Sequence, residues 1–300
     1  MPISPLHAPV LAWYAEHARD LPWRRPDATP WGVLVSEVML QQTPVNRVLP
    51  AYAEWLERWP TPSALAADTP GEAVRQWGRL GYPRRALRLY AAAHTITERH
   101  DGAVPASYDD LRALPGIGDY TAAAVASFAY GQRHAVLDTN VRRVLTRVVD
   151  GVRYPPTATT ARERRTAQDL LPDAPATAAR WAVAVMEVGA LVCTAAAPRC
   201  DSCPLYRECA WRQAGRPDHD GPPRRRQSYE GTDRQCRGRL LRVLRESDGA
   251  VPKARLDAVW PDPVQRERAL DTLVADGLVE PLARGRYRLP TGVAAVVPSG

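Results

Sequence analysis

Residues 111–125 read LRALPGIGDYTAAAV and carry the strongest local signal for the fold. The turn Leu-Pro-Gly-Ile-Gly at 114–118 lies between two segments of helical character. Glycine lets a backbone approach closely, and the helix start that follows points free amide groups outward, which holds a phosphate without a side chain. An ordinary tight turn would have the same letters. We predict two helices joined by this turn, with Gly116 and Gly118 as candidate contacts to a phosphate backbone.

Helical periodicity extends over the first 210 residues, because apolar side chains recur three and four positions apart, as at 10–14, 31–38 and 87–91. This pattern predicts an all-α body over residues 1–213. Residues 214–230 are rich in proline, glycine and charge without an apolar period, which predicts a linker.

Residues 231–290 form a predicted second module, followed by a tail at 291–300. Its pattern predicts three helices, near 233–244, 254–259 and 270–274, and then a hairpin made of LVEPL and RYRLP. That order resembles the winged-helix family, whose third helix and hairpin often meet DNA. A protein-docking module would have the same order of elements.

The charge balance favours an anionic partner only weakly. The chain of 300 residues has a formal charge of +7, and the segment 222–300 carries +5 of it. No apolar run approaches the ~20 residues of a membrane span, and the N-terminus does not look like a signal peptide. We therefore expect a cytoplasmic protein without membrane association. Lys253 is the only lysine.

Four of the five cysteines lie within seventeen residues, at Cys193, Cys200, Cys203 and Cys209. Clustered thiols in a reducing compartment usually hold metal rather than form disulfides. Four thiolates in one short loop can surround a single metal centre, and soft sulfur ligands suit zinc or iron–sulfur. The spacing alone leaves these two equally open.

Two carboxyl groups stand in apolar surroundings. Glu37 lies in WGVLVSEVMLQQT, residues 31–43, which is predicted to be one helix. Desolvation on an apolar face raises the pKa of an acid and makes it a proton donor, whereas a lone glutamate is more often solvated or a cap. Asp138 precedes a predicted helix, where by itself it would be an N-cap.

Seven blocks occur in order between residues 10 and 210: LPWR at 21–24, SEVMLQQT at 36–43, LGYPRRA at 80–86, LPGIGDYTA at 114–122, LDTNVRRVL at 137–145, MEVGALVC at 186–193 and the cysteine loop. This series resembles the helix-hairpin-helix DNA glycosylases with an iron–sulfur loop, and most closely the adenine glycosylases of the MutY type. The resemblance implies a two-lobed helical body, a [4Fe-4S] cluster held by the four cysteines, and an enzyme that flips a nucleotide out of the duplex.

The resemblance also implies a role for each matching residue. Glu37 would protonate the purine, and Asp138 would stabilise the positively charged sugar or bond to it, the two-carboxylate logic of glycoside hydrolysis. Asn140 and Tyr120 would position that carboxylate and close the pocket. Arg24 and Glu187 would contact the excised base. Gln42 and Tyr82 would probe the opposite base and wedge into the base stack of the DNA.

Tyr120 stands where strand-cutting relatives have the attacking lysine. Since no lysine precedes Lys253, a lyase step through a side-chain amine in the body is excluded by composition. The predicted function is monofunctional removal of adenine mispaired with 8-oxoguanine or guanine, in base excision repair. Residues 231–290 are too short and too helical for the Nudix-like domain of many MutY-type enzymes.

Two other functions stay open at this point. A thymine or uracil glycosylase acting on mispairs with guanine shares the fold, although Glu37 argues against it because a pyrimidine needs no protonation at N7. A non-catalytic iron–sulfur DNA-binding regulator would have no use for the acids Glu37 and Asp138. The expected partner is mismatched double-stranded DNA, bound by a monomer that associates with the nucleoid.

Overall fold

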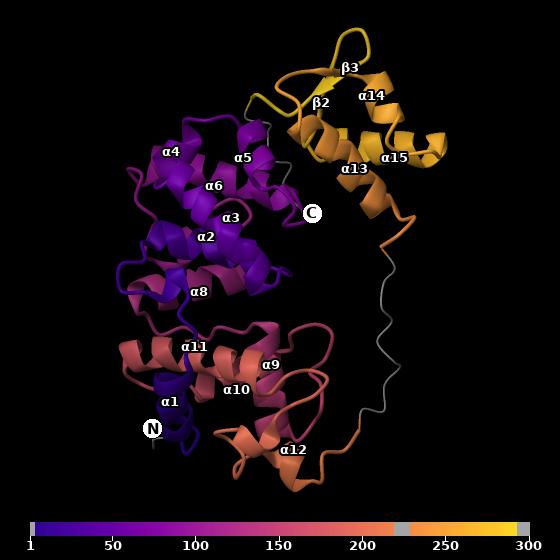
Figure 1. The fold of residues 1–300 in the computed structure, drawn as a ribbon. Helices are drawn as coiled ribbons and strands as arrows, with labels where there is room; N and C mark the ends of the chain where they lie inside the picture. The colour runs from indigo at the N-terminus through magenta and orange to yellow at the C-terminus, as the bar shows by residue number, and fades with distance from the viewer. Residues whose placement is uncertain (1–3, 219–228, 293–300) are drawn as a thin grey trace. The chain divides into compact units, whose positions relative to one another are not determined.

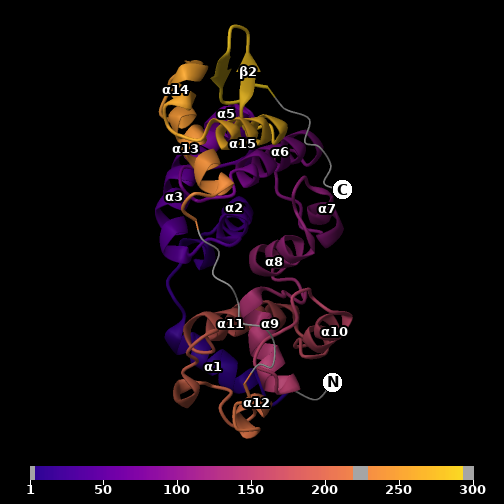
Figure 2. The same ribbon diagram turned by 90° about the vertical axis from the view of Figure 1, so that its right-hand side faces the viewer.

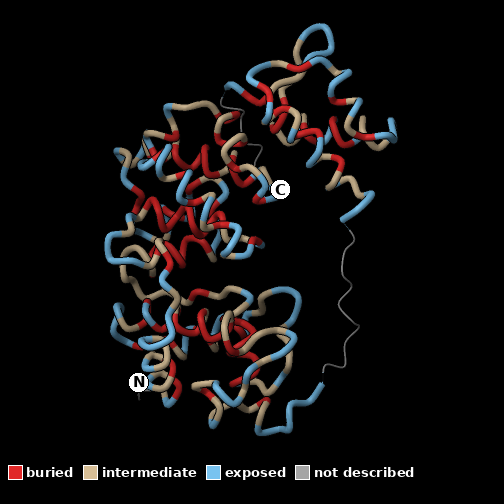
Figure 3. Tube along the Cα trace, in the orientation of Figure 1, coloured by how far each residue is buried: buried red, intermediate tan, exposed pale blue. Residues whose placement is uncertain are grey.

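The structure is a computed structural model that describes residues 4–218 and 229–292. Within this range the chain forms two compact units. Of the described residues, the first contains 4–34, 106–113 and 117–218, and the second contains 35–105, 114–116 and 229–292. Most of the predicted linker and most of the predicted tail lie outside the described residues. Figure 3 shows buried residues in red along the helices of both units and exposed ones in pale blue along many connecting loops.

The first unit is built from helices (Figure 1). They are α1 (His7–His17), the short η1 (Pro22–Arg24), the first turns of α2 (Pro30–Leu40), α7 (Tyr108–Ala113), α8 (Asp119–Tyr130), α9 (Thr139–Leu145), the π-helical η2 (Thr146–Asp150), α10 (Ala161–Asp169), α11 (Pro175–Leu191), η3 (Cys200–Ser202) and α12 (Ala210–Gln213). Helix α11 is the centre of the core, because α1, α8 and α9 all pack against it. Figure 2 shows α9 beside α11.

The second unit combines an early helical segment with the C-terminal module. Its helices are α3 (Val45–Arg58), α4 (Pro62–Ala66), α5 (Pro70–Gln76), α6 (Arg84–Arg99), α13 (Asp233–Arg245), α14 (Lys253–Asp257) and α15 (Pro263–Ala275). Thr61 and Thr69 cap α4 and α5 through their side chains, and a proline follows each cap, as the polar and prolyl starts in the sequence indicate. Before residue 251, the described residues contain no strand, which confirms the all-α prediction for the body.

The C-terminal module contains one more strand than the sequence predicted. Besides β2 (Glu280–Leu282) and β3 (Arg286–Arg288), the two residues of β1 (Val251–Pro252) pair with β3, giving the antiparallel order β1-β3-β2. A strand of two residues is too short to show an alternating pattern, so periodicity could not reveal it. The three predicted helices are present as α13, α14 and α15.

The C-terminal module is held at both ends of α5. At the start of α5, the Gly71 amide donates to the Pro290 carbonyl oxygen over 2.8 Å, and a Cβ atom at residue 71 would lie 2.6 Å from that oxygen. At its end, the Arg245 guanidinium donates to the carbonyl oxygens of Val74 and Gly78 over 2.9 and 2.5 Å. A guanidinium suits the carbonyl end of a helix, whose dipole is negative there.

Helix α2 ends earlier than predicted. It stops at Leu40, and Gln42 adopts a left-handed backbone with φ 54°, so the predicted single helix over 31–43 is wrong at its end. Pro44 follows closely, and a proline disfavours helical conformation in the residue before it. Among the described residues, no helix is both long and apolar enough to cross a membrane.

Candidate active site and cysteine loop

Asp138 is the N-cap of α9, as its position before the predicted helix indicated. Its Oδ1 accepts from the Val141 amide over 2.6 Å, and its Oδ2 accepts from the Asn140 side-chain amide over 2.7 Å. Burial raises the pKa of the Asp138 carboxyl, although these two donors and the charge of Arg143 act in the opposite direction. The structure therefore brings Asp138 and Asn140 together and fixes both carboxyl oxygens.

Asn140 is fixed in turn by its neighbours. Its Oδ1 accepts from the Arg143 guanidinium over 2.8 Å, and the same Arg143 nitrogen donates to the Gly189 carbonyl oxygen over 2.7 Å. A Cβ atom at residue 189 would lie 2.7 Å from Cβ and 2.9 Å from the carbonyl oxygen of Asn140. Gly189 thus lets α9 and α11 approach closely enough to place the carboxylate of Asp138.

Glu187 is a second buried carboxyl of the first unit, and it lies on α11. The Arg19 guanidinium donates to both its oxygens over 2.7 Å, the Arg19 backbone amide adds a bond of 3.0 Å, and Arg24 Nη1 lies 2.9 Å from Oε2. Burial alone would raise the pKa of Glu187, but the hydrogen bonds from Arg19 and the charge of Arg24 lower it. Arg24 and Glu187 are therefore an ion pair, and their contact to the excised base stays a prediction.

Arg24 keeps part of its hydrogen-bonding capacity. Its Nη1 is a buried atom for which no hydrogen bond is present, so it interacts with Glu187 through charge alone. Leaving a buried donor unpaired is unfavourable. An acceptor on a bound base could take up this N–H group.

Tyr120 and the two glycines lie at the start of α8. Tyr120 packs against a small apolar cluster that includes Ala124 and Ala182. Gly118 is the N-cap of α8, and a Cβ atom there would meet nothing within 4 Å, so this side of the helix start is open. Gly116 has φ 75°, a left-handed conformation that favours glycine, and a Cβ atom would lie 2.6 Å from the Arg88 side chain. Their contacts to DNA stay a prediction.

Glu37 belongs to the second unit and is buried in α2 with 4% of its surface exposed. The residues from Trp31 to Met39 are all buried, so the alternative of a solvated glutamate is wrong. Its role as a proton donor stays a prediction.

Gln42 and Tyr82 share an unusual backbone conformation. Their φ angles of 54° and 46° are left-handed, which is uncommon outside glycine and is often found at functional sites. Buried Arg85 joins the two turns, because it donates to the Gln41 carbonyl oxygen over 2.5 Å and to the Gly81 carbonyl oxygen over 3.0 Å. Tyr82 is half exposed, and both residues line one groove.

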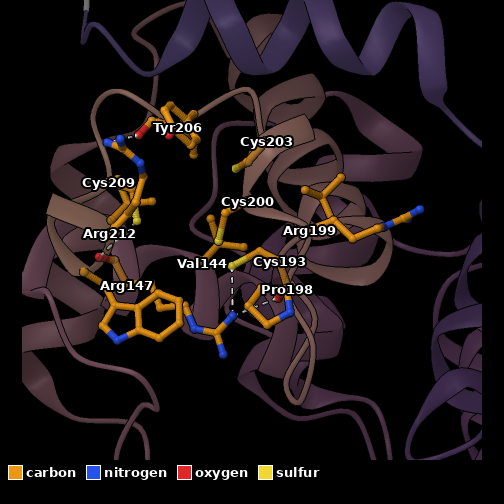
Figure 4. A pocket seen from close by; sticks show the side chains of 14 residues that line it. Val144, Arg147, Cys193, Pro198, Arg199, Cys200, Cys203, Tyr206, Cys209 and Arg212 are labelled. Atoms are coloured by element: carbon orange, nitrogen blue, oxygen red, sulfur yellow. Dashed lines mark hydrogen bonds between the residues drawn. The ribbon is translucent and has the colours of Figure 1, made fainter. Parts of the chain in front are cut away.

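The four predicted metal-binding cysteines line a single pocket of the first unit, shown from close by in Figure 4. Burial raises the pKa of Cys203 to about 12 and also raises that of Cys209. Fully buried Arg147 donates to Cys193 Sγ over 3.2 Å and to the Thr194 carbonyl oxygen over 2.8 Å. Its guanidinium lies 4.8 Å from the centre of the Trp211 ring.

Four thiols that line one pocket are a donor set for a metal centre with soft sulfur ligands. The positive charge of Arg147 beside Cys193 would offset the negative charge of bound thiolates.

Sequence reasoning missed three arginines that hold these sites in place. Arg19 neutralises Glu187, Arg85 joins the two left-handed turns and Arg147 supports the cysteine loop. Arg85 stands in the quoted block LGYPRRA, which was the only signal available for it. The partners of Arg19 and Arg147 are 168 and 46 residues away in the chain, beyond the reach of any local pattern.

Comparison with solved structures first defines the fold class. A thermostable thymine-DNA glycosylase matches with a TM-score of 0.62 and 24% identity, covering 69% of this chain and 94% of that one. A non-covalent endonuclease III–DNA complex matches with a TM-score of 0.58 and 22% identity over similar shares, 69% and 94%. The body of the chain thus has the helical fold of these DNA repair enzymes.

Sequence comparison then defines the family. The profile of HhH-GPD superfamily base excision DNA repair proteins matches residues 35–167. The adenine DNA glycosylase of Mycobacterium tuberculosis strain H37Rv is 53% identical over 94% of this chain and 92% of its own length, and that of Mycolicibacterium smegmatis is 54% identical over 96% and 97%. A thymine-DNA glycosylase of Aeropyrum pernix is 34% identical over 70% and 95%. The chain belongs to the HhH-GPD superfamily of base excision DNA repair proteins, among its adenine DNA glycosylases, which confirms the resemblance.

Proposed function

We propose that this protein is a monofunctional adenine DNA glycosylase that acts, as a monomer, on adenine mispaired with 8-oxoguanine or guanine in duplex DNA. Identity of 53% and 54% with two adenine DNA glycosylases over nearly their full lengths carries this proposal. The geometry supports it, because Asp138 is held with both oxygens fixed and Glu37 is buried in an apolar helix.

The reaction needs two carboxyl groups in opposite protonation states, one protonated and one ionised. Adenine is a poor leaving group, and Glu37 would protonate it so that it departs neutral. The sugar then becomes an oxocarbenium-like cation, and ionised Asp138 would stabilise it from the face opposite the departing base. Water completes the hydrolysis. Asn140 would keep Asp138 in place, and Tyr120 would close the pocket over the flipped nucleotide.

The excised base would be recognised by Arg24 and Glu187. Arg24 Nη1 is buried without a hydrogen-bond acceptor and could donate to a ring nitrogen of adenine. Glu187, whose pKa is lowered, holds Arg24 by charge. On the opposite strand, Gln42 would read the partner base and Tyr82 would enter the stack left open by the flipped nucleotide.

The strand should stay intact. A β-lyase needs an amine to form a Schiff base, and the sequence has no lysine before Lys253. Tyr120 offers a phenol instead. The product is therefore an abasic site that breaks only on treatment with alkali.

The four cysteines would hold a [4Fe-4S] cluster, whose contribution is to structure and to DNA engagement. Their shared pocket and the Arg147 guanidinium beside Cys193 support a thiolate-bound metal centre, and the resemblance to glycosylases with an iron–sulfur loop favours a cluster over zinc. Purified protein should be brown with absorbance near about 400 nm, and Cys203→Ala should lose the colour. A colourless protein containing one equivalent of zinc would contradict this assignment.

Base release under single-turnover conditions tests the function. Four duplexes are compared, with A opposite 8-oxoguanine, A opposite G, T opposite G and U opposite G, each analysed with and without alkali. We expect alkali-dependent cleavage at the adenine of the first two. Cleavage only at T or U would support the hypothesis of a thymine or uracil glycosylase. No cleavage in any duplex would support a DNA-binding regulator.

A further inference from the structure

A large groove of the second unit is strongly basic. It has a volume of ≈ 1310 Å³, and eleven arginines line it against one glutamate and one aspartate. Helix α13 of the C-terminal module supplies five of these arginines, and the other six come from residues 47–88. Such an excess of one sign in a concave surface attracts ions of the opposite sign.

Ion pairs inside the groove leave most of this charge uncompensated. Asp276 accepts from Arg237 over 2.5 Å and lies 3.3 Å from Arg84, while Glu246 lies 3.9 Å from Arg242. Arg85 and Arg245 donate to backbone carbonyl oxygens, which carry no net charge. Glu72, which does not line the groove, lies 2.9 Å from Arg75, and even with this third carboxylate the eleven guanidinium groups keep a net positive charge that favours an anionic ligand.

Helix α15 has the opposite character. Its two arginines are engaged within the module, since Arg266 lies 2.9 Å from Asp257 and Arg268 lies 2.7 Å from Asp233. Glu267 and Asp271 bring its formal charge to zero, whereas α13 has five arginines and one aspartate. Of these two helices the basic one is thus α13, and not the third helix with which winged-helix modules often meet DNA.

The surface of α13 also permits close approach. Arg234, Gly238 and Arg242 are spaced four residues apart and exposed, so they share one helix face. A Cβ atom at residue 238 would meet only the Tyr229 hydroxyl, at 3.4 Å. Packing therefore does not require this glycine, although glycine weakens a helix relative to alanine. Its absence of a side chain leaves the helix backbone accessible between two arginines.

We infer that this groove binds the sugar-phosphate backbone of duplex DNA through α13. The inference rests on the proposed function and extends the DNA contact from the turns of Gln42 and Tyr82, which line the same groove, to the C-terminal module. Arg234 and Arg242, two guanidinium groups on one exposed helix face, can each contact a phosphate. Contact to the backbone makes the effect independent of sequence and of the mismatch.

Two double variants of the full-length protein test the inference. Arg234→Ala/Arg242→Ala changes the groove, and Arg284→Ala/Arg286→Ala removes the same charge from exposed positions around the turn between β2 and β3, outside the groove. Affinity is measured against salt concentration for a duplex with A opposite 8-oxoguanine and for a matched duplex. The groove variant should lower affinity about equally for both duplexes and reduce the salt slope by about 2, one phosphate for each arginine. The control should leave affinity and slope close to wild type.

Three results would overturn the inference. They are an unchanged slope in the groove variant, a loss caused by the control pair instead, and a loss confined to the mismatched duplex. Gly238→Ala tests the same surface without weakening the fold. The substitution should raise Tm, because alanine stabilises a helix relative to glycine, and it should still lower DNA affinity. If wild-type protein binds DNA without releasing adenine, only the catalytic proposal is contradicted, because the proposal for the groove is tested by DNA affinity. Wild-type protein that binds neither duplex contradicts both.

Discussion

The carboxyl groups of Asp138, at the start of α9, and Glu187, in the middle of α11, differ in the direction in which the protein shifts their pKa. Asp138 accepts from two amide groups, and burial raises its pKa. Glu187 accepts a two-pronged hydrogen bond from Arg19 and lies beside Arg24, and its pKa is lowered. The difference shows that neighbouring cations, rather than burial, decide which carboxylate folding stabilises.

This difference separates a reactive group from a structural one. A carboxylate without a paired cation keeps its charge available for a cation that forms later, such as the sugar of a transition state. A carboxylate between two guanidinium groups has already been neutralised. Replacing an acid by its amide is the same chemical change at Asp138 and at Glu187. It should have opposite effects on stability at these two positions.

Asp138→Asn should produce the largest effect. Base release from A opposite 8-oxoguanine should fall on the order of 10³-fold, which is about 4 kcal/mol, because the transition state loses its counter-charge. Asparagine is also a good N-cap, and the raised pKa means that the carboxylate costs stability at neutral pH. Tm should therefore stay equal or rise. Single-turnover rates and thermal unfolding measure the two parts, and a variant with normal rates would remove Asp138 from the mechanism.

Glu187→Gln should lower stability, and it should also weaken the hold of Arg24 on the excised base. Two guanidinium groups lose their partner in a site where Glu187 is fully buried, and breaking such a pair costs about 3 kcal/mol. Denaturant unfolding checks this value, with Glu16→Gln, an exposed position of α1, as the matched control. If the two acids behaved alike in this measurement, the comparison between them would fail.

Gly189→Ala tests the contact that joins the two helices. The added methyl group would overlap Asn140, so α9 must shift and the free energy of unfolding should fall by about 2 kcal/mol. Because Asn140 holds Asp138, base release should fall as well. Gly118→Ala, at an open position, is the control for adding a methyl group, with unfolding as its readout. A stability loss without any loss of rate would show that α9 tolerates the shift.

The pH dependence of stability should be the smallest of these effects, and its sign should be opposite for Glu187 and Asp138. Glu187 has a lowered pKa, so its contribution is present above the unfolded pKa of about 4.3 and is lost as the pH falls through the folded value. Asp138 has a raised pKa, so its cost is absent below about 3.9 and grows as the pH rises toward the folded value. The stability difference between wild type and each amide variant, followed by denaturant unfolding across this range, should change in opposite directions.

The sequence predicted what depends on neighbouring residues. Asp138 precedes an apolar helical pattern, so its capping role followed from its position. Glu37 was placed on an apolar helix, and its burial agrees. Each of these outcomes is decided within a few residues of chain.

Features that depend on distant partners could not be predicted in this way. The charge state of Glu187 is set by Arg19 and Arg24, more than 160 residues earlier in the chain. The left-handed turns at Gln42 and Tyr82 are joined by Arg85, whose bonds cross over forty residues. The resemblance named several of these residues, but only the structure identifies the groups that hold them.

The contacts at both ends of α5 have a consequence for synthesis of the protein. The Gly71 amide meets the Pro290 carbonyl oxygen, so this part of the second unit cannot close until 219 further residues have been translated. At the ribosomal rate of 5–20 residues per second, about 10 to 40 s pass between the synthesis of Gly71 and that of Pro290. During that interval the emerging chain lacks the cover of residues 289 and 290 on α5. The start of α5 therefore gains this cover only when translation of residues 1–290 is complete.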